Sequence, residues 1–94
     1  MPEIGSQHIF VNYVGHISFM TGRSCESIQM HLPGTIGDLL EVLEKKYPGL
    51  KDLFIPSSGI FNSRTGIILR RRAESVPVIS MDHGLKPGDI VTLW

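Results

Sequence analysis

The sequence predicts an α+β domain in which one mixed sheet of four to five strands packs on one main helix. Three observations lead to this prediction: a single clearly amphipathic helical segment, strand-like segments on both sides of it in the chain, and a length of 94 residues, which suits one domain. A one-sided helix needs a second layer to cover its apolar face, and the strands supply that layer. We therefore expect residues 1–94 to form a single domain, with the polar stretch 1–7 as a loose tail.

The main helix is expected within Pro33–Leu50. Thr35 is a suitable N-cap, and Asp38 three residues later can complete a capping box. The Pro-Gly pair at 48–49 ends the helix. Apolar residues recur at steps of three and four, which places them on one helix face. These residues are Ile36, Leu39, Leu40, Leu43 and Tyr47.

Two strands are expected before this helix. The first, His8–Val14, carries apolar residues on both faces, which is typical of a central strand. Its faces are Ile9, Val11 and Tyr13 on one side and His8, Phe10, Asn12 and Val14 on the other. The second, Glu26–Leu32, alternates cleanly between apolar and polar residues and is near enough to pair with the first as a hairpin. In the loop between them, a short helical turn at Ser18–Met20 could bring Phe19 and Met20 over one end of the core.

The chain after the helix supplies the remaining strands. An irregular stretch, Lys51–Gly66, comes first, and within it we expect packed residues Leu53–Ile55, a turn at Pro56–Gly59 and a brief return to the core at Ile60–Phe61. A strand Ile67–Arg71 and a short edge strand Pro77–Met81 follow. A tight turn, Leu85–Asp89, then leads into the last strand, Ile90–Trp94. The first and last strands are the most apolar, so we expect them side by side in the middle of the sheet. This order of strands around one helix is that of the β-grasp, or ubiquitin-like, fold.

The composition argues against several classes of partner and location. Nine basic and nine acidic residues give a formal net charge of zero, so no global attraction to nucleic acid or to a membrane surface is expected. No apolar run approaches the ~20 residues of a membrane span, and no signal peptide is visible. The lone Cys25 excludes an internal disulfide and fits a reducing compartment. We therefore expect a cytoplasmic protein that binds neither nucleic acid nor membrane.

No pattern of residues indicates catalysis, a metal or a cofactor. Cys25 has no accompanying histidine or aspartate pattern, so an inert thiol is the favoured interpretation. The four histidines share no metal-ligand spacing. We expect a protein that is not an enzyme and has no catalytic, cofactor-binding or metal-binding residues.

The candidate partner-binding residues fall into two groups. The first is the arginine run at 70–72, in which Arg70 and Arg72 would share a strand face; it is either a solvated strand end or a docking point for an acidic partner or a phosphate. The second group lies on the sheet face away from the helix and consists of Phe10, Ile90, Thr92 and Trp94. There, Phe10 and Trp94 either form one exposed aromatic patch, or Trp94 folds over local apolar surface.

Three stretches of the chain resemble the MoaD/ThiS family of ubiquitin-like sulfur carriers. They are Ser18–Gly22, Pro33–Leu40 continuing to Tyr47–Leu50, and Leu85–Val91. The long loop after the first strand makes the small subunit of molybdopterin synthase the most similar branch. The resemblance implies a partner protein, which is a molybdopterin-synthase large subunit, an adenylating enzyme or a diverged partner.

The chain departs from this family at two places. The family's reactive tail ends in Gly-Gly after the last strand, whereas this sequence ends at Trp94 and lacks that dipeptide. No reactive residue can therefore be carried over. The expected function is that of a non-catalytic interaction module that docks through its open sheet face; the alternative is a sulfur carrier for molybdenum or tungsten pterin cofactors whose tail is absent from this chain. The family also has an Asn-Gly hairpin turn where this chain has Arg70–Ser75, so we expect that connection to be built differently.

Overall fold

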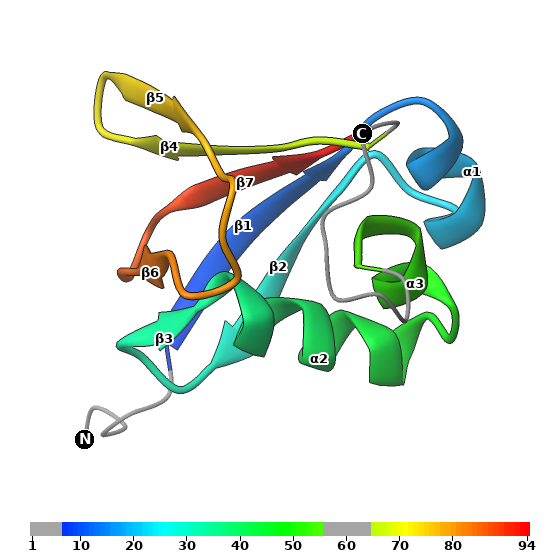
Figure 1. Ribbon diagram of the computed structural model, residues 1–94, viewed down its shortest axis with the longest axis horizontal. Helices are drawn as coiled ribbons and strands as arrows, with labels where there is room; N and C mark the ends of the chain where they lie inside the picture. The colour runs from blue at the N-terminus through cyan, green and yellow to red at the C-terminus, as the bar shows by residue number, and fades with distance from the viewer. Residues whose placement is uncertain (1–6, 56–64) are drawn as a thin grey trace.

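A computed structural model describes residues 7–55 and 65–94 and shows one mixed sheet with a main helix across one of its faces (Figure 1). The sheet has five strands in the order β2-β1-β7-β4-β5. These strands are β1 (Gln7–Tyr13), β2 (Cys25–Met30), β4 (Ile67–Arg71), β5 (Glu74–Pro77) and β7 (Ile90–Leu93). The first and last strands pair in parallel at the centre, and every other pair in this sheet is antiparallel. The predicted β-grasp arrangement is confirmed.

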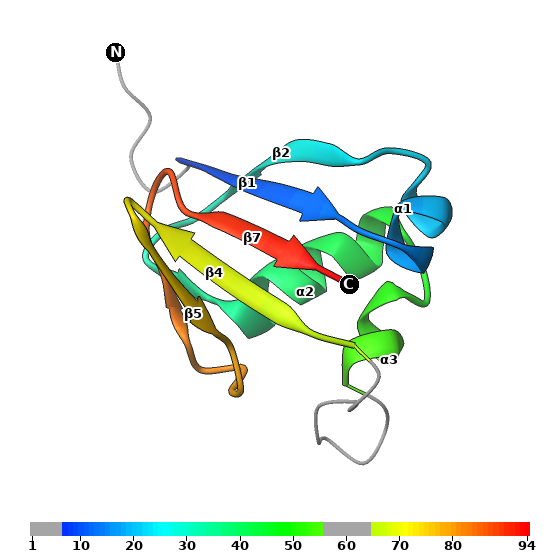
Figure 2. The ribbon, with the colours of Figure 1, turned by 90° about the horizontal axis from the view of Figure 1, so that it is seen from above.

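The main helix, α2 (Ile36–Lys46), lies under the sheet and covers one face of it (Figure 2). Its predicted apolar face is confirmed, because Ile36, Leu39, Leu40 and Leu43 are fully buried. The capping box is also present: the Asp38 amide donates to Thr35 Oγ1 at 3.2 Å, and the Thr35 amide donates to Asp38 Oδ2 at 3.0 Å. These two bonds satisfy donors that the first turn of a helix otherwise leaves unpaired.

A small second sheet ties the start of α2 to the loop that precedes β7. It pairs β3 (Gly34–Thr35) with β6 (Gly84–Leu85). The amides of Ile36 and Gly37 donate to the carbonyls of His83 and Met81, both at 2.9 Å. A Cβ at position 37 would lie 3.2 Å from the end of the Met81 side chain, so Gly37 leaves room for this close approach. The close approach of these two segments explains a residue that otherwise weakens a helix.

Two short helices close the end of the core near the C-terminus. Helix α1 (His16–Thr21) follows β1, and α3 (Leu50–Phe54) follows α2. The expectation that Phe19 and Met20 cover the core is wrong: Phe19 is 88% exposed, and Ile17 fills this position with no exposure. The helix begins two residues earlier than expected, which turns Phe19 outward. The predicted packing of the segment after α2 is confirmed by the buried Phe54 and Ile55.

The remaining strand predictions were correct in part. Strand β4 has the predicted bounds, while β2 ends at Met30 rather than at Leu32. The short edge strand was misplaced: β5 is Glu74–Pro77, so the proline ends the strand instead of starting it. It still lies at the edge of the sheet, as its missing amide requires. The expected tail at 1–7, apart from Gln7 in β1, and the expected features at 56–61 lie outside the described residues.

The core is one layer between the sheet and α2. Its central members are fully buried side chains of β1, β7 and α2.

Among residues 7–55 and 65–94, no helix is long and apolar enough to cross a membrane.

Candidate docking surface

The open face of the sheet, on the side away from α2, carries most of the predicted partner-binding residues. Neighbouring strand residues point to opposite faces, so the buried Val91 and Leu93 send Ile90 and Thr92 to the open face. Ile90 lies opposite Phe10 of β1 in the parallel pair and opposite Arg70 of β4 in the antiparallel pair. One continuous row across the three central strands therefore presents Phe10, Ile90 and Arg70.

This row combines apolar surface with a free charge. Phe10 is 48% exposed, and Ile90 is partly exposed beside it. Arg70 is exposed and makes no ion pair or side-chain hydrogen bond with the described residues. Thr92, in the next row, pairs with Asn12 and Ile68. We call Phe10, Arg70, Ile90 and Thr92 the open-face patch. Its phenyl ring and its free guanidinium lie on either side of Ile90, and aromatic residues and arginine are enriched at protein-binding surfaces.

Trp94 lies at the other end of this face from Phe10. Phe10 pairs with Ile90, the first residue of β7, whereas Trp94 comes directly after the last residue of that strand. On the β1 side, the residue beside the end of β7 is Val14, and its amide donates to the Leu93 carbonyl at 2.9 Å. The two aromatic residues therefore do not form a single patch. The indole of Trp94 instead extends over Gly66, at the start of β4, and stays 39% exposed.

The three consecutive arginines serve different purposes. Arg70 belongs to the open-face patch, and Arg71 points to the opposite face. Strand β4 pairs with β5 up to Arg71 and Glu74, so Arg72 and Ala73 form a two-residue hairpin loop. The loop has two residues, as an Asn-Gly turn does, but its backbone is built differently, because Ala73 is not among the residues with a positive φ. The loop residue with a positive φ is Arg72, at 59°, in place of asparagine or glycine. Arg72 thus lies in the turn and not on the sheet face shared with Arg70.

Arg71 forms an ion pair with Asp89 of the tight turn before β7. Arg71 Nε and Nη2 donate to the two Asp89 oxygens at 2.9 and 2.7 Å, and Nη2 also donates to the Gly84 carbonyl at 3.2 Å. The Lys86 amide donates to Asp89 Oδ2 at 2.8 Å. Burial raises the pKa of the Asp89 carboxyl, but the bonds from Arg71 and Lys86 outweigh this and hold the pKa below its ordinary value. The tight turn predicted at Leu85–Asp89 is therefore fixed by the buried Asp89 carboxylate, which binds Arg71 of the neighbouring strand β4.

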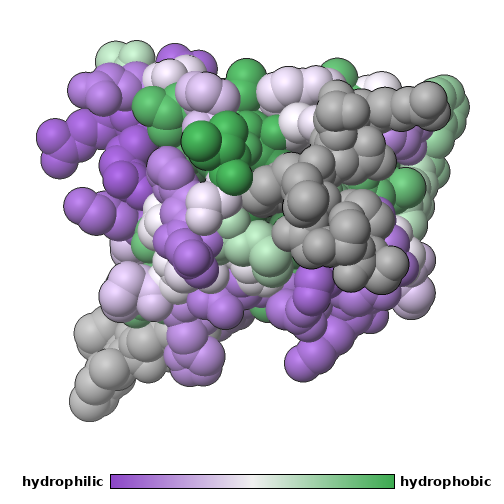
Figure 3. All heavy atoms as spheres, viewed as in Figure 1, coloured by the Kyte–Doolittle hydropathy of each residue, from purple (hydrophilic) through white to green (hydrophobic). Residues whose placement is uncertain are grey.

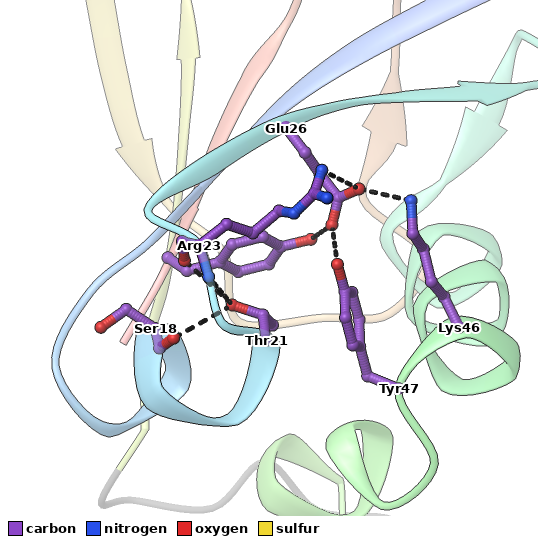
Figure 4. A network of polar contacts seen from close by, with 7 residues as sticks. Ser18, Thr21, Arg23, Glu26, Lys46 and Tyr47 are labelled. Atoms are coloured by element: carbon purple, nitrogen blue, oxygen red, sulfur yellow. Dashed lines mark hydrogen bonds and ion pairs between the residues drawn. The ribbon is translucent and has the colours of Figure 1, made fainter.

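A buried carboxylate at the other end of the core joins three elements, and it is not among the site residues predicted from the sequence. Glu26 of β2 has a side chain only 3% exposed. Its Oε1 accepts hydrogen bonds from the hydroxyls of Tyr13 and Tyr47 at 2.7 and 2.5 Å, and its Oε2 accepts from Lys46 Nζ at 2.5 Å (Figure 4). Arg23 lies 3.5 Å from Oε2 on the opposite side of the carboxylate from Lys46. The cluster links β1, β2 and the end of α2.

The cluster changes the acid–base properties of its members. Burial raises the pKa of Glu26, but the hydrogen bonds from Lys46, Tyr47 and Tyr13 outweigh this and hold the pKa below its ordinary value. Burial, followed by the bond to Glu26, raises the pKa of both tyrosines. The carboxylate is therefore held charged and the phenols neutral. This arrangement stabilises a structure and leaves no group poised to transfer a proton near neutral pH.

The remaining candidate residues do not converge. Cys25 is exposed at the start of β2, in the row of Asn12. Within residues 7–55 and 65–94, no three histidine, cysteine, aspartate or glutamate side chains lie close enough together to hold a metal ion.

Comparison with known proteins gives matches by structure alone. No family model matches the sequence, and no curated protein matches it. The HVO 2177 protein from Haloferax volcanii superposes with a TM-score of 0.76 at 20% identity, over 99% of this chain and 86% of that one. SAMP1 from the same organism gives a TM-score of 0.69 at 19% identity, over 96% and 93% of the two chains.

A third similar structure connects the fold with the resemblance noted in the sequence. A proposed molybdopterin converting factor, subunit 1, from Pyrococcus furiosus superposes with a TM-score of 0.66 at 20% identity, over 93% of this chain and 94% of that one. The chain therefore has the ubiquitin-like fold shared by small archaeal modifier proteins and this MoaD-like protein, and at the level of the fold the predicted resemblance is confirmed.

Proposed function

We propose that this chain is a non-catalytic ubiquitin-like module that binds another protein through the open-face patch. The observation that carries the proposal is the row formed by Phe10, Ile90 and Arg70, in which an exposed ring, an aliphatic side chain and an unpaired guanidinium adjoin across three strands. The sheet fixes the backbone that carries these side chains, so binding would order the side chains but not the backbone of this surface. Exposed apolar surface of this kind on a small domain is typical of a partner site.

The partner that the resemblance favours is an adenylating enzyme or a molybdopterin-synthase large subunit. The likeness to SAMP1 and to the P. furiosus protein supports this choice of partner class. Such partners use ATP or pterin substrates of the cytoplasm, which is therefore the location we propose. An exposed, unpaired Cys25 is compatible with a reducing compartment.

The test is a calorimetric titration with the adenylating enzyme and the large subunit encoded in the same genome. We expect Phe10→Ala to weaken binding about tenfold, as truncation of a central aromatic anchor does. Ile79→Ala is the matched control, because Ile79 is 84% exposed but lies outside the sheet. Equal losses for Phe10→Ala and Ile79→Ala, with both variants folded, would contradict the role of the patch. Trp94→Ala, at the far end of the face, should weaken binding less than Phe10→Ala does.

The second candidate function is sulfur carriage for a molybdenum or tungsten pterin cofactor, which the likeness to the P. furiosus protein favours. Trp94 itself is an unsuitable acceptor. Its amide donates to the Gly66 carbonyl at 3.1 Å, and its own carbonyl accepts from the Gly66 amide at 2.9 Å. A reactive Gly-Gly carboxylate would therefore have to follow Trp94, and the gene beyond this codon shows whether it does. The assay incubates the native protein with the adenylating enzyme, ATP and a sulfur donor. A mass increase for the exchange of one oxygen by sulfur supports carriage, and no increase excludes it.

A further inference from the structure

A second surface lies on the helix side of the sheet, at the tip of the β4–β5 hairpin. The hairpin and the turn before β7 enclose an open groove with a charged rim. Its apolar wall is formed by the exposed Val76 and Pro87, together with the buried Leu69 of the core. Figure 3 shows hydrophilic side chains gathered over the hairpin tip, beside an apolar area over the segment that follows β5. Strand alternation separates this groove from the open-face patch, because Arg71 points into it while Arg70 points away.

The charges that face solvent in the groove are mainly positive. Arg72 and Lys86 are exposed and have no side-chain partner among the described residues. The acidic side chains of the lining are Asp89, which is 1% exposed and bound by Arg71, and the exposed Glu74. Two free cations thus face one free carboxylate, with His83 at the margin.

Arg71 adds a donor that is already fixed in position. Asp89 and Gly84 occupy its Nε and Nη2 groups, whereas Nη1 has no partner among the described residues, and the side chain is 38% exposed. A guanidinium held by a buried carboxylate loses little conformational freedom when it binds a further acceptor. A carboxylate in the groove could therefore accept from Arg71 while Arg72 and Lys86 close over it.

We propose that this groove binds a short acidic and aliphatic peptide segment of a partner protein. The free cations complement acidic side chains, and the apolar wall complements aliphatic ones. Nucleic acid fits less well, because the lining contains no phenylalanine, tyrosine or tryptophan on which a base could stack, and the chain has no net charge.

The test is a titration of the isotope-labelled protein, followed by NMR, with a capped peptide of alternating glutamate and aliphatic residues. We expect saturable shifts at the amides of 71–76 and 83–89. Arg72→Asn, which tolerates a positive φ, should weaken binding about threefold, as loss of one exposed ion pair does. Glu74→Gln should strengthen it about twofold by removing a like charge. Lys45→Gln is the matched control, because Lys45 is an exposed cation of α2, outside both surfaces, with no side-chain partner among the described residues. It should leave the affinity unchanged.

Several results would overturn the proposal. The first is the absence of saturable binding, or shifts centred on Phe10 and Ile90 instead of the groove. A second is an equal effect of Lys45→Gln and Arg72→Asn, or weaker binding by Glu74→Gln. A third is equal binding of the same peptide with lysine in place of glutamate, or tighter binding of an oligothymidylate. Because the groove and the open-face patch lie on opposite sides of β4, either site can fail without the other.

Discussion

The indole ring of Trp94 occupies the space in which a side chain at residue 66 would lie. A Cβ built on Gly66 would overlap the six-membered ring of the indole. The two residues also exchange backbone hydrogen bonds, at 2.9 and 3.1 Å, which extends the β4–β7 pairing beyond the end of β7. Gly66 does not have a positive φ, so the glycine is required by the ring and not by the backbone conformation.

Gly66→Ala should therefore displace the indole and destabilise the protein. We expect a loss of roughly 1–3 kcal/mol in the free energy of unfolding, the usual cost of overpacking. Urea unfolding measures the loss, and fluorescence reports the displacement directly because Trp94 is the sole tryptophan.

Two controls isolate the steric cause. Gly84→Ala should change the stability by less than about 0.5 kcal/mol, because the nearest atom to a Cβ there is 4.0 Å away. In a Trp94→Ala background, Gly66→Ala should cost little. A full cost in that background would show that the indole is not the reason for the glycine.

Glu26→Gln should destabilise the protein although it preserves the size of the side chain. The glutamine side chain has one acceptor oxygen and one NH₂ donor in place of two carboxylate oxygens. It cannot accept the hydrogen bonds of Tyr13, Tyr47 and Lys46 together, so a buried donor or acceptor is left unpaired. The expected loss is roughly 1–3 kcal/mol. Denaturant unfolding gives the value.

Glu41→Gln is the matched control for this substitution. Glu41 forms an ion pair with Lys51, but its side chain is 54% exposed, so the change should be within about 0.5 kcal/mol. Equal losses for the two variants would mean that the buried cluster is worth no more than a surface pair.

The sequence contained a signal for this cluster. Glu26 has the same parity in its strand as Ile28 and Met30, so alternation places its carboxylate on the covered face. A charge on that face requires partners, but the partners come from β1 and α2, and sequence spacing does not show which side chains meet across elements. The helix cap, by contrast, was predictable because Thr35 and Asp38 are three residues apart.

The residues of the open sheet face were predicted correctly, but their layout was not. Alternation correctly sent Phe10, Ile90 and Thr92 to the face away from α2. The distance between Phe10 and Trp94 depends on the register of two strands that are about eighty residues apart in sequence, and only the structure gives that register. The outward direction of the Phe19 side chain was also not predictable from the sequence, because it depends on the residue at which α1 begins.

Stability should fall in acid because two buried carboxyls have lowered pKa values in the folded state. Glu26 and Asp89 both titrate below their ordinary values when folded. Their contribution is fully present above the unfolded pKa, about 4, and is lost as the pH falls through the lower folded pKa. Urea unfolding should give a nearly constant free energy down to about pH 5 and a decline below about pH 4. In Glu26→Gln and Asp89→Asn the decline should be shallower, and an unchanged slope in both variants would contradict the assignment.

Tyrosine ionisation gives the complementary test at high pH. Both tyrosines of the chain donate to Glu26 Oε1, and a phenolate at either position would face that carboxylate. Burial and this bond raise both pKa values, so the stability from the neutral phenols is fully present below the unfolded pKa, about 10, and is lost as the pH rises above it. The ultraviolet absorbance of ionised phenol should rise at higher pH in the native protein than in urea. In Glu26→Gln the native curve should move toward the unfolded one, because the carboxylate charge is gone while the burial remains. Superposition of the native and unfolded curves of the unaltered protein would show that the phenols are not held by Glu26.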